Sequence, residues 1–525
     1  MGSFFLLLLS LLISESFSYK ILVFSPAISR SHLISNGRIA DTLALAGHDV
    51  IILEPDFTDI VNITNTASHA RRKPVHGLNN TSFMGESNSR SLDIFQATSL
   101  YTDMKKRIAY QIDYTDLCEQ VFLRSELIEE LKEEKFDAYF GEQNNICGFG
   151  IAHILNIKHK FWISSCTIGS QIRLILGMEN PTSYLPLATH LDEDSKLLQR
   201  AYNLMYYLAE NMASCYTNGY ITGMLRSHFG SDFPDINDLA ASSDIIFVNS
   251  EELLDIQTPT LPNIIHIGGL GVKESSDELD DKFSAAMRKG LKGVVLFSLG
   301  TMVNTTSLPS KIMESVLKIA QSFPDYQFLI RVDKNDKNTL ETAKDIENVL
   351  VSDWLPQPAI LAHPRLQLFI THAGYNSLLE AARAGVPLLS IPFINDQPRN
   401  GRAVASKGWG MTRTKDDLAH HPEKIQEAIN EILTNDKYRN TARKLQKLIR
   451  SRPTTPAERL VKTTEWVIAN EGVPQLKTAG RHLGFIVYYN IDVITVFVVL
   501  PITVFIILTT KILCTLTPPG KVKSE

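Results

Sequence analysis

The chain has 525 residues, too many for one hydrophobic core of ordinary size, so we expect two or three domains. Hydrophobic residues make up 44% and charged residues 21%, a balance that excludes a mostly disordered chain, a collagen and a simple coiled coil. Lys and Arg number 52 against 57 Asp and Glu, and a net charge of −5 provides no basic field for nucleic acid. Five cysteines without a C-x-x-C pair predict neither a disulfide-stapled scaffold nor a zinc site.

The N-terminus carries an apolar run from Phe4 to Ile13, followed by Ser16-Phe17-Ser18, a small-x-small pattern suited to signal peptidase. We interpret residues 1–18 as a secretory signal peptide, despite the lack of basic residues before the run. An uncleaved signal anchor stays open. Myristoylation at Gly2 is disfavoured because the hydrophobic run follows at once.

Residues 19–265 predict a first α/β domain. Short apolar runs typical of buried parallel strands occur at 20–25, 49–53, 136–140 and 160–163. Helical patterns occur at about 35–46, with Gly47 as C-cap, and at about 92–135 and 194–228. Ligands of such sheets bind beyond the carboxyl ends of the strands. The aromatic residues of 194–228 could line an apolar acceptor pocket, although core packing is the more common reason for them.

A second α/β half is predicted after Pro262, with the domain proper at 282–470. Ile264 to Gly269 enters a polar stretch, Lys273 to Asp281, that we interpret as a linker. Expected strands are 293–299, 327–332, 349–352, 366–370 and 386–391, separated by helical patterns such as 311–322, 377–384 and 422–433. This alternation predicts a second parallel sheet, and two sheets facing each other across a cleft suit one substrate per half.

An 18-residue apolar run, Val493 to Thr510, predicts a transmembrane helix of about 27 Å, near the thickness of a bilayer. Asp492 is expected at one interface because a central Asp is costly to insert, and a membrane helix tolerates Pro501. The alternative is a buried core helix, but nothing follows in the sequence that could cover it.

The tail, residues 511–525, carries Lys511, Lys521 and Lys523, which favours a cytosolic tail and a lumenal body, a single-pass type I arrangement. Lys521 and Lys523 resemble the K-x-K-x-x signal that returns such proteins to the endoplasmic reticulum (ER); a solvated basic tail is the alternative. The sequons at Asn62, Asn79 and Asn80 are then expected glycan sites, and the one at Asn304 is expected to stay unmodified.

The most informative stretch is FITHAGYNSLLEAARAGVPLLSIPFINDQ, residues 369–397. A strand ends, a turn passes through Gly374, and a helix opens near Asn376, which is an arrangement that binds phosphate. His372, Asn376 and Ser377 add donors, and Glu380 could hold ribose hydroxyls. Taken singly, Asn376 and Ser377 could be helix caps and Glu380 an ordinary first-turn acid.

The whole stretch resembles the sugar-nucleotide signature of the UDP-glycosyltransferases: T-H-x-G-x-x-S-x-x-E, then P-L-L-x-x-P, then D-Q. Trp354-Leu355-Pro356-Gln357 resembles the family's W-x-P-Q, whose Trp stacks on uracil, and residues 297–301 resemble its phosphate-side loop. The resemblance covers essentially the whole chain, from the signal peptide to the dilysine tail. In this arrangement the chain is similar to the animal membrane-bound UDP-glucuronosyltransferases of the ER. Residues 37–41 and 46–50 look like the corresponding residues of a nematode-type branch of this family.

The resemblance implies a GT-B fold, two facing Rossmann-like domains plus one C-terminal transmembrane helix. The first domain would bind the acceptor and the second the UDP-sugar, with a helix near 457–471 crossing back to the first. Asp396 and Gln397 would bond the sugar hydroxyls. The implied donor-site residues are Ser298, Trp354, Gln357, Thr371, His372, Gly374, Asn376, Ser377, Glu380, Asp396 and Gln397.

His32 matches the family's catalytic position, in a loop expected after the first strand. A His with a pKa near 6.5 can take the proton of an acceptor hydroxyl, worth about 10²–10⁴ in rate, although a lone loop His is usually only a surface residue. The family usually orients this base with an Asp, and this chain has Glu142 five residues after Asp137, a departure of one methylene. Asp137 is the alternative orienting acid, and His48 is interpreted as structural.

The implied reaction is direct displacement at the anomeric carbon, inverting an α-linked UDP-sugar to a β-glycoside on a small lipophilic acceptor. No metal or cofactor is implied, because the UDP-sugar is a co-substrate. UDP-glucuronate is the leading donor and UDP-glucose the alternative. A weakly catalytic ER membrane partner that binds apolar ligands is the rival of a different class, and a homo- or hetero-oligomer is possible for either.

Overall fold

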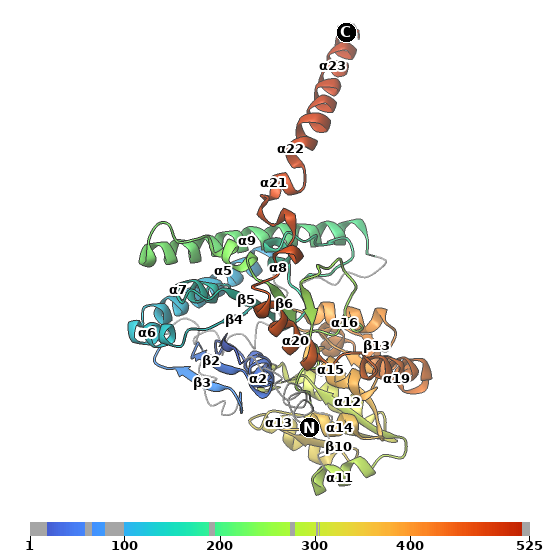
Figure 1. The fold of residues 1–525 in the computed structure, drawn as a ribbon. Helices are drawn as coiled ribbons and strands as arrows, with labels where there is room; N and C mark the ends of the chain where they lie inside the picture. Colours follow the sequence, from blue (N-terminus) through green and yellow to red (C-terminus); the bar gives the residue numbers. More distant parts are fainter. Residues whose placement is uncertain are drawn as a thin grey trace, which may run out of the picture.

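The computed structural model describes residues 18–57, 66–78, 99–187, 195–272, 279–300, 303 and 305–516. These residues form two α/β halves in contact with each other, and a long helix leaves the body near the C-terminus (Figure 1). Residues 1–17, the sequons at Asn62, Asn79, Asn80 and Asn304, and the tail lysines Lys521 and Lys523 lie outside the described residues.

The N-terminal half is built on a seven-stranded parallel sheet with the order β3-β2-β1-β4-β5-β6-β7. Its strands are β1 (Lys20–Phe24), β2 (Asp49–Pro55), β3 (Arg71–Val75), β4 (Ala138–Glu142), β5 (His159–Ser164), β6 (Ile245–Val248) and β7 (Ile264–His266). The strand order reverses between β1 and β4, so the carboxyl ends of these two strands border the crevice where doubly wound sheets bind ligands.

Helices cover both faces of this sheet: α2 (Arg30–Leu45) packs on one face, and most of the others pack on the opposite face. The latter group comprises α5 (Leu100–Phe122), α6 (Ser125–Glu133), α7 (Gly148–Ile154), α8 (Ser170–Ile175), α9 (Leu197–Phe229) and α10 (Ile236–Ala241). The sequence predicted β1, β2, β4 and β5. It missed β3, whose residues RRKPV have no apolar pattern, and β6, a four-residue run.

Two sequence expectations for this half are wrong. The second half was expected to start after Pro262, which overlaps the first domain expected at 19–265, yet β7 pairs with β6 and so belongs to the first sheet. The first helix was expected from about Ser35, yet α2 begins at Arg30 because Ser29 caps it by accepting a hydrogen bond from the His32 backbone N–H. His32 therefore lies in the first turn of a helix and not in a loop.

The C-terminal half has a six-stranded parallel sheet with the order β10-β9-β8-β11-β12-β13. Its strands are β8 (Gly293–Ser298), β9 (Tyr326–Arg331), β10 (Val349–Ser352), β11 (Leu366–Thr371), β12 (Leu388–Ser390) and β13 (Gly410–Thr412). The sequence predicted all but the three-residue β13. The order reverses between β8 and β11, which places a second ligand crevice at Ser298 and Thr371.

Helices flank this second sheet on both faces. They are α11 (Asp281–Arg288), α12 (Ser310–Gln321), α13 (Lys337–Thr342), α14 (Gln357–Ala362), α15 (Tyr375–Ala384), α16 (Gln397–Ser406), α17 (Lys415–His420), α18 (Pro422–Thr434) and α19 (Asp436–Arg450). The following helix, α20 (Pro456–Ala469), buries Leu460 and Val467 in the core around Ile21 and Val23 of β1, which confirms the expected crossing back to the first half.

A disulfide joins Cys118 of α5 to Cys147, the residue before α7. No sequence pattern singles out these two of the five cysteines as a pair, because they lie 29 residues apart and only the fold brings them together. Disulfides persist in oxidising compartments and are rare in the cytosol.

After α21 (Phe485–Tyr488), Ile491–Leu513 form an apolar helical stretch long enough to cross a membrane by length and composition. It joins α22 (Ile491–Ile494), a π-helical turn (Thr495–Val499) and α23 (Leu500–Leu516), and none of it is buried against the body. The alternative of a buried core helix is therefore wrong. The π-helical turn ends two residues before Pro501, a residue that interrupts regular helical hydrogen bonding.

Candidate active site

The first crevice brings His32 and Glu142 together. Glu142 is the last residue of β4, and His32 follows β1, the neighbouring strand across the reversal point. Nδ1 of His32 lies 2.9 Å from Oε1 of Glu142. Because the carboxylate holds Nδ1, Nε2 is the ring nitrogen left to take a proton from a substrate.

Glu142 is buried and held by two neighbours that the sequence analysis missed. Ser165, just beyond the end of β5, donates its hydroxyl to Oε1 at 2.8 Å, and the backbone N–H of Asn144 donates to Oε2 at 2.9 Å. The Asn144 side chain also lies 3.2 Å from Nδ1 of His32. Ser165 and Asn144 both follow strands next to the reversal point, and this position could have identified them as candidates from the sequence.

The two charges shift each other's proton affinity. Burial alone would lower the pKa of His32, but Glu142, with a smaller contribution from Asp396, outweighs it and raises that pKa above its ordinary value. Burial alone would raise the pKa of Glu142, but His32 and the hydrogen bonds from Asn144 and Ser165 outweigh it and lower that pKa. The carboxylate therefore stays ionised and makes His32 a stronger base.

The structure places the other two candidates elsewhere. Asp137 precedes β4, at the opposite end from Glu142, and accepts a hydrogen bond from the Lys20 backbone N–H. His48 is buried beside the Tyr19 backbone N–H and 3.4 Å from Glu465 of α20. Both residues hold the fold together at the edge away from His32.

The second crevice gathers Ser298, Thr371, His372 and Gly374. Ser298 and Thr371 end the paired strands β8 and β11, and the Ser298 hydroxyl accepts a hydrogen bond from the Gly300 backbone N–H. The His372 ring sits between two glycines: a Cβ on Gly300 would lie 2.4 Å from the ring and one on Gly374 would lie 2.5 Å from it. Only glycine at these positions lets both loops approach the ring.

Burial, with a smaller effect from Arg331, lowers the pKa of His372 to about 4. The imidazole is therefore neutral at physiological pH and can donate one hydrogen bond without bringing a charge. Ala373, next in the chain, has a left-handed backbone (φ 65°), a strained conformation of the kind found at ligand sites.

Helix α15 (Tyr375–Ala384) carries three of the residues predicted to bind the donor, Asn376, Ser377 and Glu380. Its N-cap is Gly374, so no side chain caps its first turn, and Asn376 and Ser377 are not caps. Gln357 of α14 donates to Glu380 at 2.7 Å and lies 3.4 Å from the Ser377 hydroxyl. The backbone N–H groups of the first turn of α15 therefore have no side-chain cap, and they lie at the helix end that favours anions.

Trp354 is exposed, with the Arg30 guanidinium 5.3 Å from its ring centroid. Arg30 is the first residue of α2 in the N-terminal half, and Trp354 belongs to the C-terminal half, so this contact joins the two halves.

Asp396 is the N-cap of α16 and Gln397 is its first residue. Asn400 of the same helix connects this helix start to the loop after β11, which carries His372 and Gly374. The Asn400 amide donates to the Asp396 carboxylate at 2.7 Å and to the Ala373 carbonyl at 3.0 Å. Oε1 of Gln397 accepts from the backbone N–H groups of Phe393 and Ile394, so its amide N–H₂ is the part that can donate to a ligand. Asn400 is a further residue that the sequence analysis missed.

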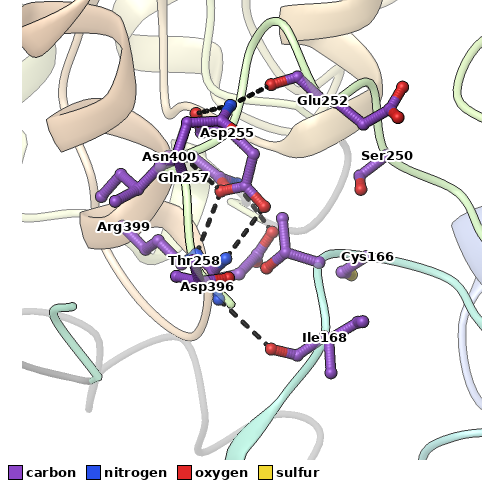
Figure 2. Close-up of polar contacts among 12 residues, drawn as sticks. Cys166, Ile168, Ser250, Glu252, Asp255, Gln257, Thr258, Asp396, Arg399 and Asn400 are labelled. Atoms are coloured by element: carbon purple, nitrogen blue, oxygen red, sulfur yellow. Dashed lines mark hydrogen bonds and ion pairs between the residues drawn. The ribbon is translucent and has the colours of Figure 1, made fainter. Parts of the chain in front are cut away.

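A buried ion pair locks the two halves together beside this loop (Figure 2). Arg399 of α16 donates to the Asp255 carboxylate at 2.9 and 3.2 Å and to the Ile168 carbonyl at 3.2 Å. Asp255 and Ile168 belong to the N-terminal half. Asp396 lies close enough to His32 to contribute to the raised pKa of His32, so the start of α16 and the His32–Glu142 pair are neighbours across the contact between the halves.

Comparison with known proteins agrees with this geometry. A family profile described as "UDP-glucoronosyl and UDP-glucosyl transferase" matches residues 19–518. The chain belongs to this family. It is a glycosyltransferase that transfers sugar from a UDP-sugar, and the recognition made from residues 369–397 is confirmed.

The chain is 50% identical over 489 residues to the Caenorhabditis elegans protein named "Putative UDP-glucuronosyltransferase ugt-48", covering 92% of this chain and 93% of that one. It is 48% identical over 483 residues to ugt-47 of the same worm, covering 91% and 89%. A solved structure, the glycosyltransferase of kitacinnamycin, superposes with a TM-score of 0.57 at 18% identity, covering 87% of this chain and 99% of that one. That likeness confirms the GT-B fold.

Substitutions at the start of α16 should weaken donor use more than acceptor use. We expect Asp396→Ala and Gln397→Ala each to cost about 1–3 kcal/mol of donor binding, roughly 5–150-fold in donor KM. Gln397→Glu is the matched variant, because it keeps the two bonds to Phe393 and Ile394 but loses the donating N–H₂. Initial rates at varied UDP-sugar measure this; unchanged donor KM in all three variants would contradict the sugar-contact assignment.

Proposed function

We propose that this enzyme transfers glucuronic acid from UDP-glucuronate to hydroxyl groups of small lipophilic acceptors, with inversion to a β-glycoside. The observation that carries the proposal is the 2.9 Å contact between His32 and Glu142, with Asp396 of the donor signature close enough to contribute to the raised pKa of His32. A base on one half and a donor site on the other is the arrangement that a direct displacement needs.

In the proposed step, Nε2 of His32 takes the acceptor hydroxyl proton while that oxygen attacks the anomeric carbon. The bond from that carbon to the UDP oxygen breaks, and its electron pair leaves with UDP. The imidazolium is stabilised by Glu142, which Ser165 and Asn144 hold in place. Neutral His372, the Ser298 loop and the first turn of α15 would stabilise the charge on leaving UDP, with no metal or cofactor.

The test supplies the full-length enzyme in microsomes with equal UDP-glucuronate and UDP-glucose and a phenolic acceptor, and analyses the product. A β-glucuronide as the main product supports the proposal. A β-glucoside in its place would assign the alternative donor, which the family description covers equally. Neither product, with UDP-sugar still bound, would favour the weakly catalytic ligand-binding partner.

The pH profile of Glu142→Gln separates the orienting acid from a merely structural residue. Glu142 raises the pKa of His32, and the base must be neutral, so activity falls as pH drops through that raised pKa. Without the carboxylate, the acid limb of kcat/KM should move to lower pH, while the plateau falls by less than the about 10²–10⁴ expected for the base itself.

Asp137→Asn is the matched control for this profile, because it removes a carboxylate that directly precedes the same strand and bonds the Lys20 backbone N–H at the end of β4 away from His32. Its pH profile should be that of the wild type. An unshifted acid limb in Glu142→Gln would place the orienting acid elsewhere.

We propose that the enzyme is a single-pass type I protein of the ER membrane, with residues 1–18 removed and residues 19–265 and 282–470 in the lumen. The helical stretch Ile491–Leu513 supplies a span, and the Cys118–Cys147 disulfide suits an oxidising lumen. The tail from residue 511 would then lie in the cytosol.

Replacing both Lys521 and Lys523 by Ser should leave the enzyme membrane-bound but let it leave the ER. The span holds the chain by burying apolar surface, whereas the lysines would act only as a receptor-read address. Glycans at Asn62, Asn79 or Asn80 should then become resistant to endoglycosidase H. Full sensitivity of the double variant would mean that retention comes from another part of the chain, and an unglycosylated protein would contradict the lumenal orientation.

A further inference from the structure

Helix α9 has its polarity reversed relative to an ordinary surface helix. Its buried positions are mostly polar: Asn203, Glu210, Asn211, Ser214, Thr217, Asn218 and Thr222. Its exposed positions are apolar, with Leu198 81% exposed, Met212 74% and Tyr216 60%. A helix on a water-soluble face would bury the second set and expose the first.

The exposed apolar residues form one continuous stripe, which we call the α9 stripe. They recur every three or four positions and so lie on one side of the helix. Its members are Leu198, Tyr202, Met205, Leu208, Met212, Tyr216 and Tyr220. No exposed residue between positions 201 and 223, about 33 Å of helix, carries a charge.

The buried face of α9 packs on the N-terminal half through α5, α8 and α10. Figure 1 shows α9 lying across the end of the body from which α21, α22 and α23 leave. The α9 stripe is thus turned away from the body, on the side where the apolar helix departs.

Contacts from the segment before the apolar helix hold that segment against the same end of the body as α9. The Tyr488 hydroxyl of α21 donates to the Gly177 carbonyl, just after α8, at 2.8 Å, and Tyr489 hydrogen-bonds Tyr207 of α9. This segment is itself apolar and exposed at Phe485, Ile486 and Val487, so it extends the stripe toward Ile491, where the span begins.

We propose that the α9 stripe lies in the surface of the bilayer that Ile491–Leu513 crosses and holds the catalytic body flat against the membrane. The inference rests on the membrane placement proposed above. An uncharged apolar face suits the headgroup–acyl boundary, where such helices sink about 5–10 Å, and tyrosines suit the same boundary because one end is apolar and the other polar. The stripe continues into the span, which makes the bilayer its occupant.

Cys215, an exposed free thiol next to Tyr216, allows a direct test in the full chain. With Cys166 and Cys514 replaced by Ser, Cys215 receives a nitroxide spin label, and the protein is reconstituted in phosphatidylcholine vesicles. Collision with membrane-soluble O₂ is compared with collision with water-soluble NiEDDA. Matched labels sit at Val504→Cys in the span and at Glu341→Cys, exposed on α13 of the other half, each with Cys215 replaced by Ser.

We expect the ratio of O₂ to NiEDDA collisions at Cys215 to be several-fold above that at position 341 and below that at position 504. A ratio equal to that at position 341 overturns the inference. A label shielded from both reagents, and released by diluting the protein in lipid, would mean that a second copy covers the stripe, which also overturns it. A water-exposed label at position 504 would instead refute the span and the membrane placement.

A charged variant checks that the stripe itself makes the contact. Leu208→Asp with Met212→Asp should lower the ratio at Cys215 to that at position 341, because carboxylates resist entry into the boundary. Leu291→Asp is the control, since Leu291 is 89% exposed in the other half and should leave the ratio unchanged. An unchanged ratio in the double variant contradicts the proposal.

Discussion

Transfer by His32→Ala should fall by about 10²–10⁴, while UDP still binds with the wild-type affinity. The loss is large because the acceptor hydroxyl is a weak nucleophile until a base takes its proton, and the base that we propose is Nε2 of His32, whose Nδ1 is held by Glu142. UDP binding should persist because the donor residues lie on the other half of the molecule, around α15 and α16. Initial rates and UDP titration calorimetry measure the two quantities.

His420→Ala is the matched control, because His420 is exposed on α17 and its ion-pair partner among the described residues is Asp416 of the same helix. It should retain wild-type rates. Activity of His32→Ala above a tenth of the wild type would remove His32 from the mechanism, and a parallel loss of UDP binding would point to a folding defect in place of a missing base.

Sequence alone predicted what depends on local pattern. Parallel strands buried on both faces give continuous apolar runs, so β1, β2, β8 and β11 were readable. Strand β3 could not be recognised from the sequence. It lies at the edge of the described sheet, and its residues, RRKPV, form no apolar run. The start of α2 was missed because the Ser29 cap and the polar first turn carry no apolar periodicity.

The candidate site divides in the same way. Most of the proposed donor residues lie within residues 369–397, and the fold brings Gln357 of α14 to Glu380 of α15. Glu142 was reached only through the family's spacing, yet the structure places it against His32, 110 residues away in the chain. Ser165, Asn400 and the Arg399–Asp255 pair depend on which strand ends and loops meet, information that one-dimensional spacing does not contain.

Arg399→Ala should lower the free energy of unfolding by about 3–5 kcal/mol, the cost of leaving a buried partner charge uncompensated. Asp255 would lose both hydrogen bonds that pair it with Arg399 and stay at the contact between the halves, and the Ile168 carbonyl would lose its donor. Because α16 begins at Gln397, the same change should also raise donor KM. Denaturant unfolding of the purified full chain measures the first effect.

The double variant Arg399→Met with Asp255→Leu distinguishes two causes of the lost stability: the loss of the ion pair itself, and the burial of an Asp255 charge without its partner. Replacing a buried ion pair by apolar residues of similar volume is often close to neutral, so the double variant should recover most of the lost stability. Its donor KM should stay raised, because the apolar pair gives up the directional bonds that fix α16 against the N-terminal half. Additive losses in the double variant would show that the two side chains act independently and that this ion pair does not clamp the cleft.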